Sequence, residues 1–199
     1  MAVSASDFAW HASAVGKTIL LSGAVGSGKS TIMRLGYRAL SAHWGPTATI
    51  DTDTIVMMVD PTWELSDEER DYELAGWQIW LLARSFLSRG FECVLIGGNA
   101  PHTPDRALND LIGRLLGVGD VYHVTLDPSP AQTQRRVAQR GGGPRPEWVT
   151  EHVGRLRATY QDWTCRVDNS RLSPLETVAE IAARIEQGHG KLTEPIQTE

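Results

Sequence analysis

A run of small residues near the start of the chain holds the residue types with the clearest chemistry. It fits the pattern G-x-x-x-x-G-K-[ST], known as Walker A, and comprises Gly23, Ala24, Val25, Gly26, Ser27, Gly28, Lys29, Ser30 and Thr31. Its glycines let successive backbone N–H groups point toward phosphate oxygens. An apolar strand candidate (18–22) precedes the run, and a helical segment (29–43) follows it, adding a partial positive charge. We predict that these residues bind ATP, with Lys29 on the β and γ phosphates and Ser30 on Mg²⁺.

Two carboxylates follow the second apolar run of the sequence. Asp51 is the last residue of the strand candidate 48–51, and Asp53 lies two residues beyond it. In a parallel sheet the carboxyl ends of the strands gather at the ligand crevice, so a carboxylate here can take a proton from an acceptor hydroxyl. We predict Asp53 as the catalytic base, with Asp51 as an orienting residue or an N-cap. The alternative is that either aspartate only caps the next turn.

Several arginines lie around a helix end that three glycines follow. Arg135, Arg136 and Arg140 precede Gly141–Gly143, and Arg145 lies just beyond them. Arginines on a closing segment suit the charge that develops on a transferred phosphoryl group. We predict a lid over about 135–148, with Arg136 and Arg140 catalytic and Arg140 also contacting the nucleotide. The alternative is a solvated basic helix end that favours the helix dipole.

Aromatic and polar residues in the middle of the chain are candidates for holding the acceptor. Trp63 precedes the long helical segment 66–87, and Trp77 lies opposite the apolar stripe of that segment. A substrate, a neighbouring helix or a dimer partner could cover Trp77 and its neighbour Trp80. After the strand candidate 93–96, Gly97 and Gly98 permit close approach to a ligand. The predicted substrate residues are therefore Asp53, Trp63, Trp77, Asn99, His102 and Arg106.

These residues need a framework, and the remaining pattern supplies one. Short apolar runs at 18–22, 48–51, 93–96, 121–126 and 164–167 alternate with helical segments. Such alternation is typical of βαβ units and an α/β fold with a five-stranded parallel sheet. With 199 residues the chain suits one domain. We divide it into an N-terminal extension (1–17), a single domain (18–190) and a frayed tail (191–199).

Composition limits the partners and the location. The net charge is −5, which argues against nucleic acid and anionic lipid as partners. Basic residues comprise sixteen Arg and three Lys, so the lysine of the glycine-rich run stands out. Cys93 and Cys165 show no metal-ligand spacing, and no apolar stretch could span a membrane. We expect a cytoplasmic protein, either a monomer or a homodimer, that acts on a small molecule.

The sequence lacks the Asn-Lys pair that a guanine-reading N-K-x-D segment requires, which argues against a GTPase. Its small size favours a kinase over motor or transporter ATPases, whose other signatures are absent. Such a kinase needs a base, a substrate platform, cations and a lid besides the phosphate loop. The candidate residues above fill these four roles.

Taken together, the glycine-rich run, Asp51-Thr52-Asp53, the arginine cluster and Val167-Asp168-Asn169-Ser170 resemble a broad group of P-loop kinases. The group includes zeta-toxin-like enzymes, chloramphenicol phosphotransferase and the kinase domain of polynucleotide kinase. The resemblance implies a P-loop kinase fold, ATP with Mg²⁺, and transfer of the γ-phosphoryl to a hydroxyl, with Asp53 as the catalytic aspartate. This chain departs from many relatives at Gly97-Gly98, where they carry an acidic residue. Mg²⁺ would then rest on Ser30, the phosphates and water, with Asp53 as an additional candidate.

The leading hypothesis is an ATP-dependent phosphotransferase that acts on a hydroxyl of a small molecule, and an antibiotic is one candidate acceptor. Two other enzymatic readings are a kinase of nucleic-acid 5′-hydroxyls and a toxin that phosphorylates a nucleotide sugar. A reading from another class is a regulatory switch that binds ATP with little turnover. The last reading requires neither Asp53 nor a lid arginine aligned on the γ-phosphate.

Overall fold

The computed structural model describes residues 16–59, 61, 68–98, 106–141, 144–158 and 164–195. Strands and helices alternate along these residues as the sequence predicts. The strands are β1 (Lys17–Gly23), β2 (Thr47–Asp51), β3 (Cys93–Gly97), β4 (Asp120–Leu126), β5 (Cys165–Val167) and β6 (Lys191–Leu192). The helices are α1 (Lys29–Trp44), α2 (Thr52–Val59), α3 (Glu68–Ser88), α4 (Arg106–Leu116), α5 (Pro130–Gln139), α6 (Pro146–Ala158) and α7 (Pro174–Glu186).

Five strands form a parallel sheet in the order β2-β3-β1-β4-β5. This arrangement confirms the predicted α/β fold. The sequence predicts a frayed tail from residue 191, but Lys191 and Leu192 instead form β6, which pairs antiparallel with β4. Leu192 is buried there, and the Lys191 ammonium lies 3.0 Å from Asp120 Oδ1, so both residues of β6 are tied to β4.

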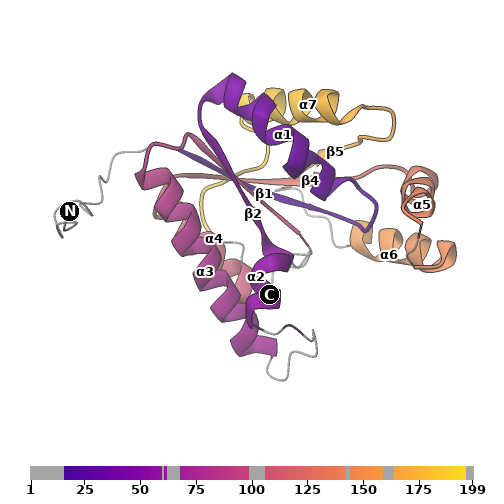
Figure 1. Ribbon diagram of the computed structural model, residues 1–199, viewed down its shortest axis with the longest axis horizontal. Helices are drawn as coiled ribbons and strands as arrows, with labels where there is room; N and C mark the ends of the chain where they lie inside the picture. The colour runs from indigo at the N-terminus through magenta and orange to yellow at the C-terminus, as the bar shows by residue number, and fades with distance from the viewer. Residues whose placement is uncertain are drawn as a thin grey trace.

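Helices cover both faces of the sheet, as Figure 1 shows. One apolar cluster joins α1 and α7 to the face that carries Ile19 and Leu21. A second joins α2, α3 and α4 to the face that carries Leu20 and Ile96. The alternation of Ile19, Leu20 and Leu21 between the two clusters follows from the two-residue period of a strand. Burial of both faces explains why the strand sequences show no polar alternation.

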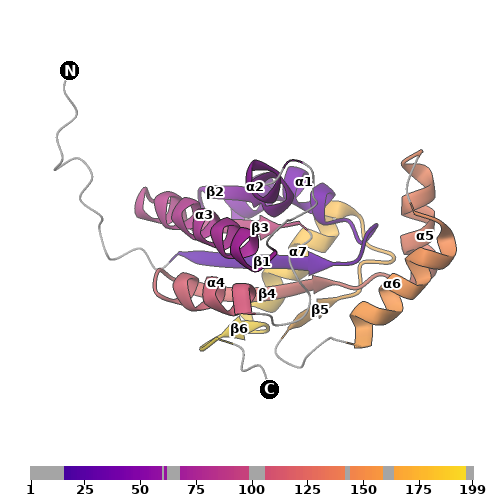
Figure 2. The same cartoon turned by 90° about the horizontal axis from the view of Figure 1, so that it is seen from below.

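Helices α5 and α6 lie outside these two layers, beyond the end of β1 (Figures 1 and 2). A third apolar cluster packs them against the residues that follow β1, and it contains Ala24, Val137, Val149, Val153 and Leu156. The predicted lid (about 135–148) includes the end of α5 and the start of α6, two helices that pack on the residues after β1; that this segment closes as a lid stays a prediction. Among the described residues, no helix combines the length and apolar character needed to cross a membrane.

Candidate active site

The glycine-rich run forms a tight turn between the end of β1 and the start of α1, where the motif requires it. Gly26 has a φ of 82°, a left-handed conformation that favours glycine. A Cβ atom at Gly26 would lie 2.8 Å from Val137 Cγ2 and 2.9 Å from the Thr133 carbonyl oxygen. The turn therefore packs so closely on α5 that residue 26 has no room for a side chain.

Lys29 lies within this turn, and its side chain is only 8% exposed. Its Nζ atom donates to the carbonyl oxygens of Gly23 (2.5 Å) and Ala24 (3.3 Å). Burial lowers the pKa of Lys29 to about 8; the Asp53 carboxylate acts to raise it, and the Arg140 guanidinium acts to lower it further. The predicted phosphate-binding lysine thus lies within the electrostatic reach of two other predicted site residues, Asp53 and Arg140.

Arg136, one of the predicted lid cations, joins three parts of the site. Its Nη1 atom donates to the Ser27 carbonyl oxygen (2.9 Å), and its Nη2 atom donates to the Asn169 carbonyl oxygen (2.8 Å). The Asn169 side chain donates from Nδ2 to the same Ser27 oxygen (3.0 Å). Arg136 therefore ties α5 to the glycine-rich run and to the segment after β5. Its catalytic role stays a prediction.

The other lid cations differ in exposure and position. Arg140 is the C-terminal cap of α5 and is exposed. Burial lowers the pKa of Arg136, and the charge of Arg140 lowers it further. The same charge also acts to lower the pKa of Lys29, so the three cations lie in one region. Arg135 and Arg145 are exposed. A phosphate group among Lys29, Arg136 and Arg140 would relieve their mutual repulsion.

One cavity lies beside the glycine-rich run and is the candidate nucleotide cavity. Residues of α1, α5, α7 and the segment after β5 line it: Gly28, Thr31, Ile32, Arg136, Gln139, Arg140, Asn169, Leu172, Pro174 and Thr177. Asn169 is 2% exposed, and its Oδ1 atom has no hydrogen-bond partner within the protein. The cavity thus contains a buried acceptor beside two arginines, which suits a polar ligand that carries phosphates.

The two predicted aspartates have different roles in the structure. Strand β2 ends at Asp51, as the sequence predicts, and α2 begins at Thr52. Asp51 Oδ1 accepts hydrogen bonds from the backbone N–H groups of Asp53 (3.0 Å) and Thr54 (3.4 Å). Asp51 is therefore a helix cap, which was the alternative reading. Asp53 lies in the first turn of α2 and is partly buried.

Gly98 explains the missing acidic residue at the end of β3. Its φ is 153°, and a Cβ atom built there would lie 2.9 Å from Asp53 Oδ1 and 3.1 Å from Asp53 N. A side chain at residue 98 would therefore collide with Asp53. The carboxylate at this edge of the sheet comes from α2 rather than from β3.

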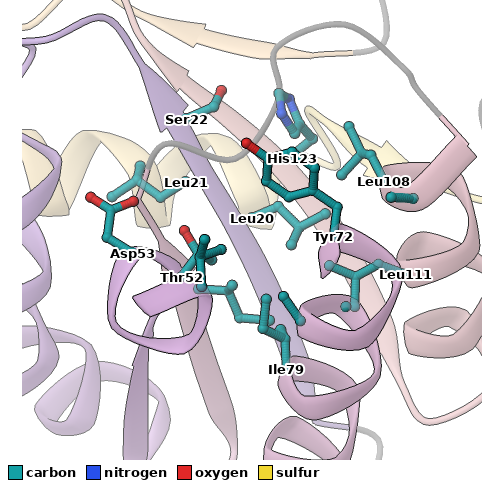
Figure 3. A pocket seen from close by; sticks show the side chains of 15 residues that line it. Leu20, Leu21, Ser22, Thr52, Asp53, Tyr72, Ile79, Leu108, Leu111 and His123 are labelled. Carbon is teal, nitrogen blue, oxygen red and sulfur yellow. The ribbon is translucent and has the colours of Figure 1, made fainter. Parts of the chain in front are cut away.

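A second cavity, largely apolar, adjoins Asp53 (Figure 3). In the figure, Asp53 and Thr52 lie on one side of this cavity, and Tyr72, Leu108 and Leu111 face them from α3 and α4. The full lining is Leu20, Leu21, Ser22, Thr52, Asp53, Val56, Tyr72, Ala75, Gly76, Ile79, Ile96, Ala107, Leu108, Leu111 and His123. This cavity can hold a molecule whose hydroxyl reaches Asp53.

The predicted substrate residues Trp77 and Arg106 do not line this apolar cavity. Both lie in a separate groove between α3 and α4, with Glu73 and Arg114. The Arg114 guanidinium lies 4.0 Å from the Trp77 ring centroid, and Arg106 pairs with Glu73 at 3.5 Å. Trp77 is therefore in contact with a neighbouring helix, α4, which is one of the three possibilities that the sequence left open. The role of Trp77 and Arg106 as substrate residues stays a prediction, and Trp63, Asn99 and His102 lie outside the described residues.

Sequence reasoning missed several residues of the site. Tyr72 and His123 line the apolar cavity, and Asn169 lines the nucleotide cavity. His152 lies on the α6 face that also carries Val149, three residues before it. Burial lowers the pKa of His152, as do the charges of Arg155 and Lys29.

The donors available for Mg²⁺ are few but of the right kind. Ser30 is exposed in the first turn of α1, and the Asp53 carboxylate lies within electrostatic reach of Lys29 in the same site. Among the described residues, no group of three or more His, Cys, Asp and Glu side chains could form a metal cage. Mg²⁺ is usually held by one or two protein oxygens together with nucleotide phosphates and water. Ser30 and Asp53 fit that mode of binding.

The sheet order, the phosphate-binding turn and the helical pair over it define a P-loop protein with the fold of the P-loop kinases. A family model described as an AAA domain matches residues 18–162, and the chain belongs to this family. No curated protein matches the chain by sequence. The residues matched include the glycine-rich run, Asp53 and the arginine cluster.

Three solved structures illustrate the fold. Shikimate kinase from Bacteroides thetaiotaomicron has a TM-score of 0.60 and 18% identity, over 85% of this chain and 98% of that one. APS kinase from Mycobacterium tuberculosis has a TM-score of 0.57 and 20% identity, over 87% of this chain and 99% of that one. The tunicamycin resistance protein of Deinococcus radiodurans has a TM-score of 0.58 and 17% identity, over 85% of this chain and 95% of that one. These likenesses confirm the P-loop kinase fold; the narrower group stays a prediction.

Proposed function

We propose that the protein transfers the γ-phosphoryl group of ATP to a hydroxyl group of a small molecule. The observation that carries this proposal is that Asp53 lines the apolar cavity and also acts electrostatically on Lys29 of the phosphate-binding turn. A carboxylate so placed can serve an acceptor on one side and a phosphoryl donor on the other.

In the reaction we propose, the acceptor hydroxyl lies in the apolar cavity and gives its proton to the Asp53 carboxylate. The acceptor oxygen forms a bond to the γ-phosphorus as the bond from that phosphorus to the ADP oxygen breaks. Lys29 and Arg140 stabilise the negative charge that develops on the phosphoryl oxygens. Ser30, with Asp53, would hold Mg²⁺, which neutralises phosphate charge when it is bound.

A hydroxylated antibiotic is the acceptor class that we propose to test first, because the cavity beside Asp53 suits a molecule with an apolar body. The P-loop kinase fold and the name of one structural neighbour, a tunicamycin resistance protein, support this choice without establishing it. A nucleic-acid end is less compatible with the net charge of −5.

The experiment is a screen of hydroxylated antibiotics, nucleosides, nucleotide sugars and oligonucleotide 5′ ends with ATP and Mg²⁺. Mass spectrometry would detect the gain of one phosphoryl group. The Lys29→Met variant serves as the control for contaminating kinases. Modification of a small alcohol by the wild type alone is the expected result. ATP binding without transfer to any acceptor would favour a regulatory switch.

A further inference from the structure

The chemistry of the apolar cavity specifies an acceptor more narrowly than the proposed function does. Nine aliphatic side chains from β1, β3, α2, α3 and α4 line it. Asp53 is the one side chain with a permanent charge among the described lining residues. No arginine or lysine of the described lining could therefore pair with a carboxylate, sulfate or phosphate on the acceptor.

Hydrogen bonds further reduce the polarity of the cavity wall. Ser22 and His123 line the cavity, and each bonds to a threonine of a neighbouring strand or segment. Ser22 Oγ lies 2.8 Å from Thr125 Oγ1, which lies 2.9 Å from Thr164 Oγ1. Thr164 Oγ1 in turn lies 2.6 Å from His123 Nδ1. These hydrogen bonds link four side chains, from Ser22 of β1 through two threonines to His123 of β4, and include Thr164, the residue before β5.

The chain of hydrogen bonds occupies polar groups that would otherwise attract a polar ligand. All four of its members are buried, so the bonds satisfy groups that would be costly to leave unpaired. His123 and Thr125 alternate with Val124 along β4 and therefore share the face of the sheet that carries the cavity. The part of the wall that Ser22 and His123 form is consequently held fixed, and its hydrogen-bonding capacity is partly used within the protein.

The size of the cavity sets a further bound. Its volume is about 80 Å³, which at roughly 10–15 Å³ for each water corresponds to about six waters. That space fits a single ring with small substituents. A charged group in it would lose its hydration with no described counter-ion, and a second anion near Asp53 would also be repelled.

We propose that the apolar cavity selects an uncharged alcohol whose reacting hydroxyl is attached to an apolar ring or a branched alkyl group. This proposal rests on the proposed function for the role of the hydroxyl, but the binding preference is independent of catalysis. It distinguishes the protein from a kinase that grips an anionic acceptor by arginines. The same cavity excludes a nucleotide or an anionic sugar from the position next to Asp53.

The test compares two alcohols that differ only in charge: para-methylbenzyl alcohol and para-carboxybenzyl alcohol. Binding of each to the full chain would be measured by ligand-observed NMR, with Mg²⁺ and ATP present and absent, and phosphorylation by mass spectrometry. We expect the neutral alcohol to bind tighter by about tenfold or more. Equal affinities, tighter binding of the carboxylate, or binding of neither alcohol would overturn the proposal.

A pair of variants locates the binding. Tyr72→Arg places a cation in the cavity, whereas Leu74→Arg places one on the exposed side of α3, where Leu74 is 46% exposed. Only Tyr72→Arg should weaken binding of the neutral alcohol and reduce the difference in affinity between the neutral alcohol and the carboxylate. Equal effects of both variants would contradict the assigned cavity. Selective binding of the neutral alcohol without phosphorylation would support this inference while counting against the proposed function.

Discussion

The Nζ atom of Lys29 lies 2.5 Å from the carbonyl oxygen of Gly23, the residue that opens the glycine-rich run. The loop thus holds its own lysine through backbone dipoles while burial lowers the pKa of that lysine to about 8. Phosphate oxygens carry full negative charge and compete with carbonyl oxygens for the same ammonium group. ATP binding and protonation of Lys29 should therefore be coupled.

This coupling predicts that ATP affinity depends on pH. A lysine with a pKa lowered to about 8 is mostly protonated at pH 7 and mostly neutral at pH 9. Because phosphates favour the charged form, ATP affinity should fall by up to about tenfold per unit as pH rises above 8. Calorimetric titration between pH 7 and 9.5 would measure this, with Lys29→Arg as the variant that stays charged. A pH-independent wild-type affinity would contradict the prediction.

The contrast between Asp53 and Asp51 predicts two separable effects. Asp53→Asn should lower the turnover number by about 10²–10⁴-fold with little change in ATP affinity, because it removes the proposed base. Asp51→Ala removes a cap of α2 and should lower the free energy of unfolding by about 1 kcal/mol. Steady-state kinetics and denaturant unfolding on both variants would check these effects. Near-normal turnover in Asp53→Asn would mean that another group is the base.

The parts of the site that the sequence predicted are those fixed by local chain geometry. The run 23–31 lies between a strand and a helix, so its phosphate-binding turn follows from the motif and its neighbours. The alternation of strands and helices along the chain likewise predicts the parallel sheet. The roles of Asp51 and Asp53 were harder to separate, because the start of α2 at Thr52 decides them.

The parts that could not be predicted depend on contacts between distant segments. The apolar cavity combines residues of β1, β3, β4, α2, α3 and α4, and no spacing in the sequence reveals which of their side chains meet. Trp77 illustrates the same limit. Its position opposite the apolar stripe of the helix left three covers open, and the contact with Arg114, thirty-seven residues later, could not be read from the sequence. Aromatic residues more often serve packing than binding, and only the fold distinguishes the two.

Arg136 and Arg135 provide a matched pair for testing the connection between α5 and the glycine-rich run. Arg136 donates to two carbonyl oxygens, whereas Arg135 is exposed. Arg136→Gln should weaken ATP binding about tenfold or more and lower the free energy of unfolding by about 1–3 kcal/mol, because buried carbonyls lose their donor. Arg135→Gln should change both by far less. Similar effects in the two variants would show that the positive charge alone, and not the hydrogen bonds of Arg136 to the Ser27 and Asn169 carbonyl oxygens, supports the site.

The predicted lid can be tested by limited digestion with trypsin. Arg140 is exposed at the end of α5, and Gly141 follows it, whereas Arg145 precedes a proline that blocks cleavage. ATP with Mg²⁺ should slow cleavage after Arg140 several-fold, because the guanidinium would then be engaged by phosphate. Cleavage after Arg89, in the turn ahead of β3, provides the internal control. Equal slowing at both sites would indicate general stabilisation rather than a closing lid.

Asp127 should anchor α6 to the sheet. Its side chain is 9% exposed; Oδ1 accepts from Arg157 Nε of α6, and Oδ2 accepts from Arg166 Nη2 of β5, both at 2.8 Å. Asp127→Asn should lower the free energy of unfolding by about 2 kcal/mol, because two arginines lose a largely buried partner. Asp120→Asn is the control, since its ion pair with Lys191 is more exposed and should cost less than about 1 kcal/mol. Equal losses for the two variants, measured by urea unfolding, would contradict an anchoring role for Asp127.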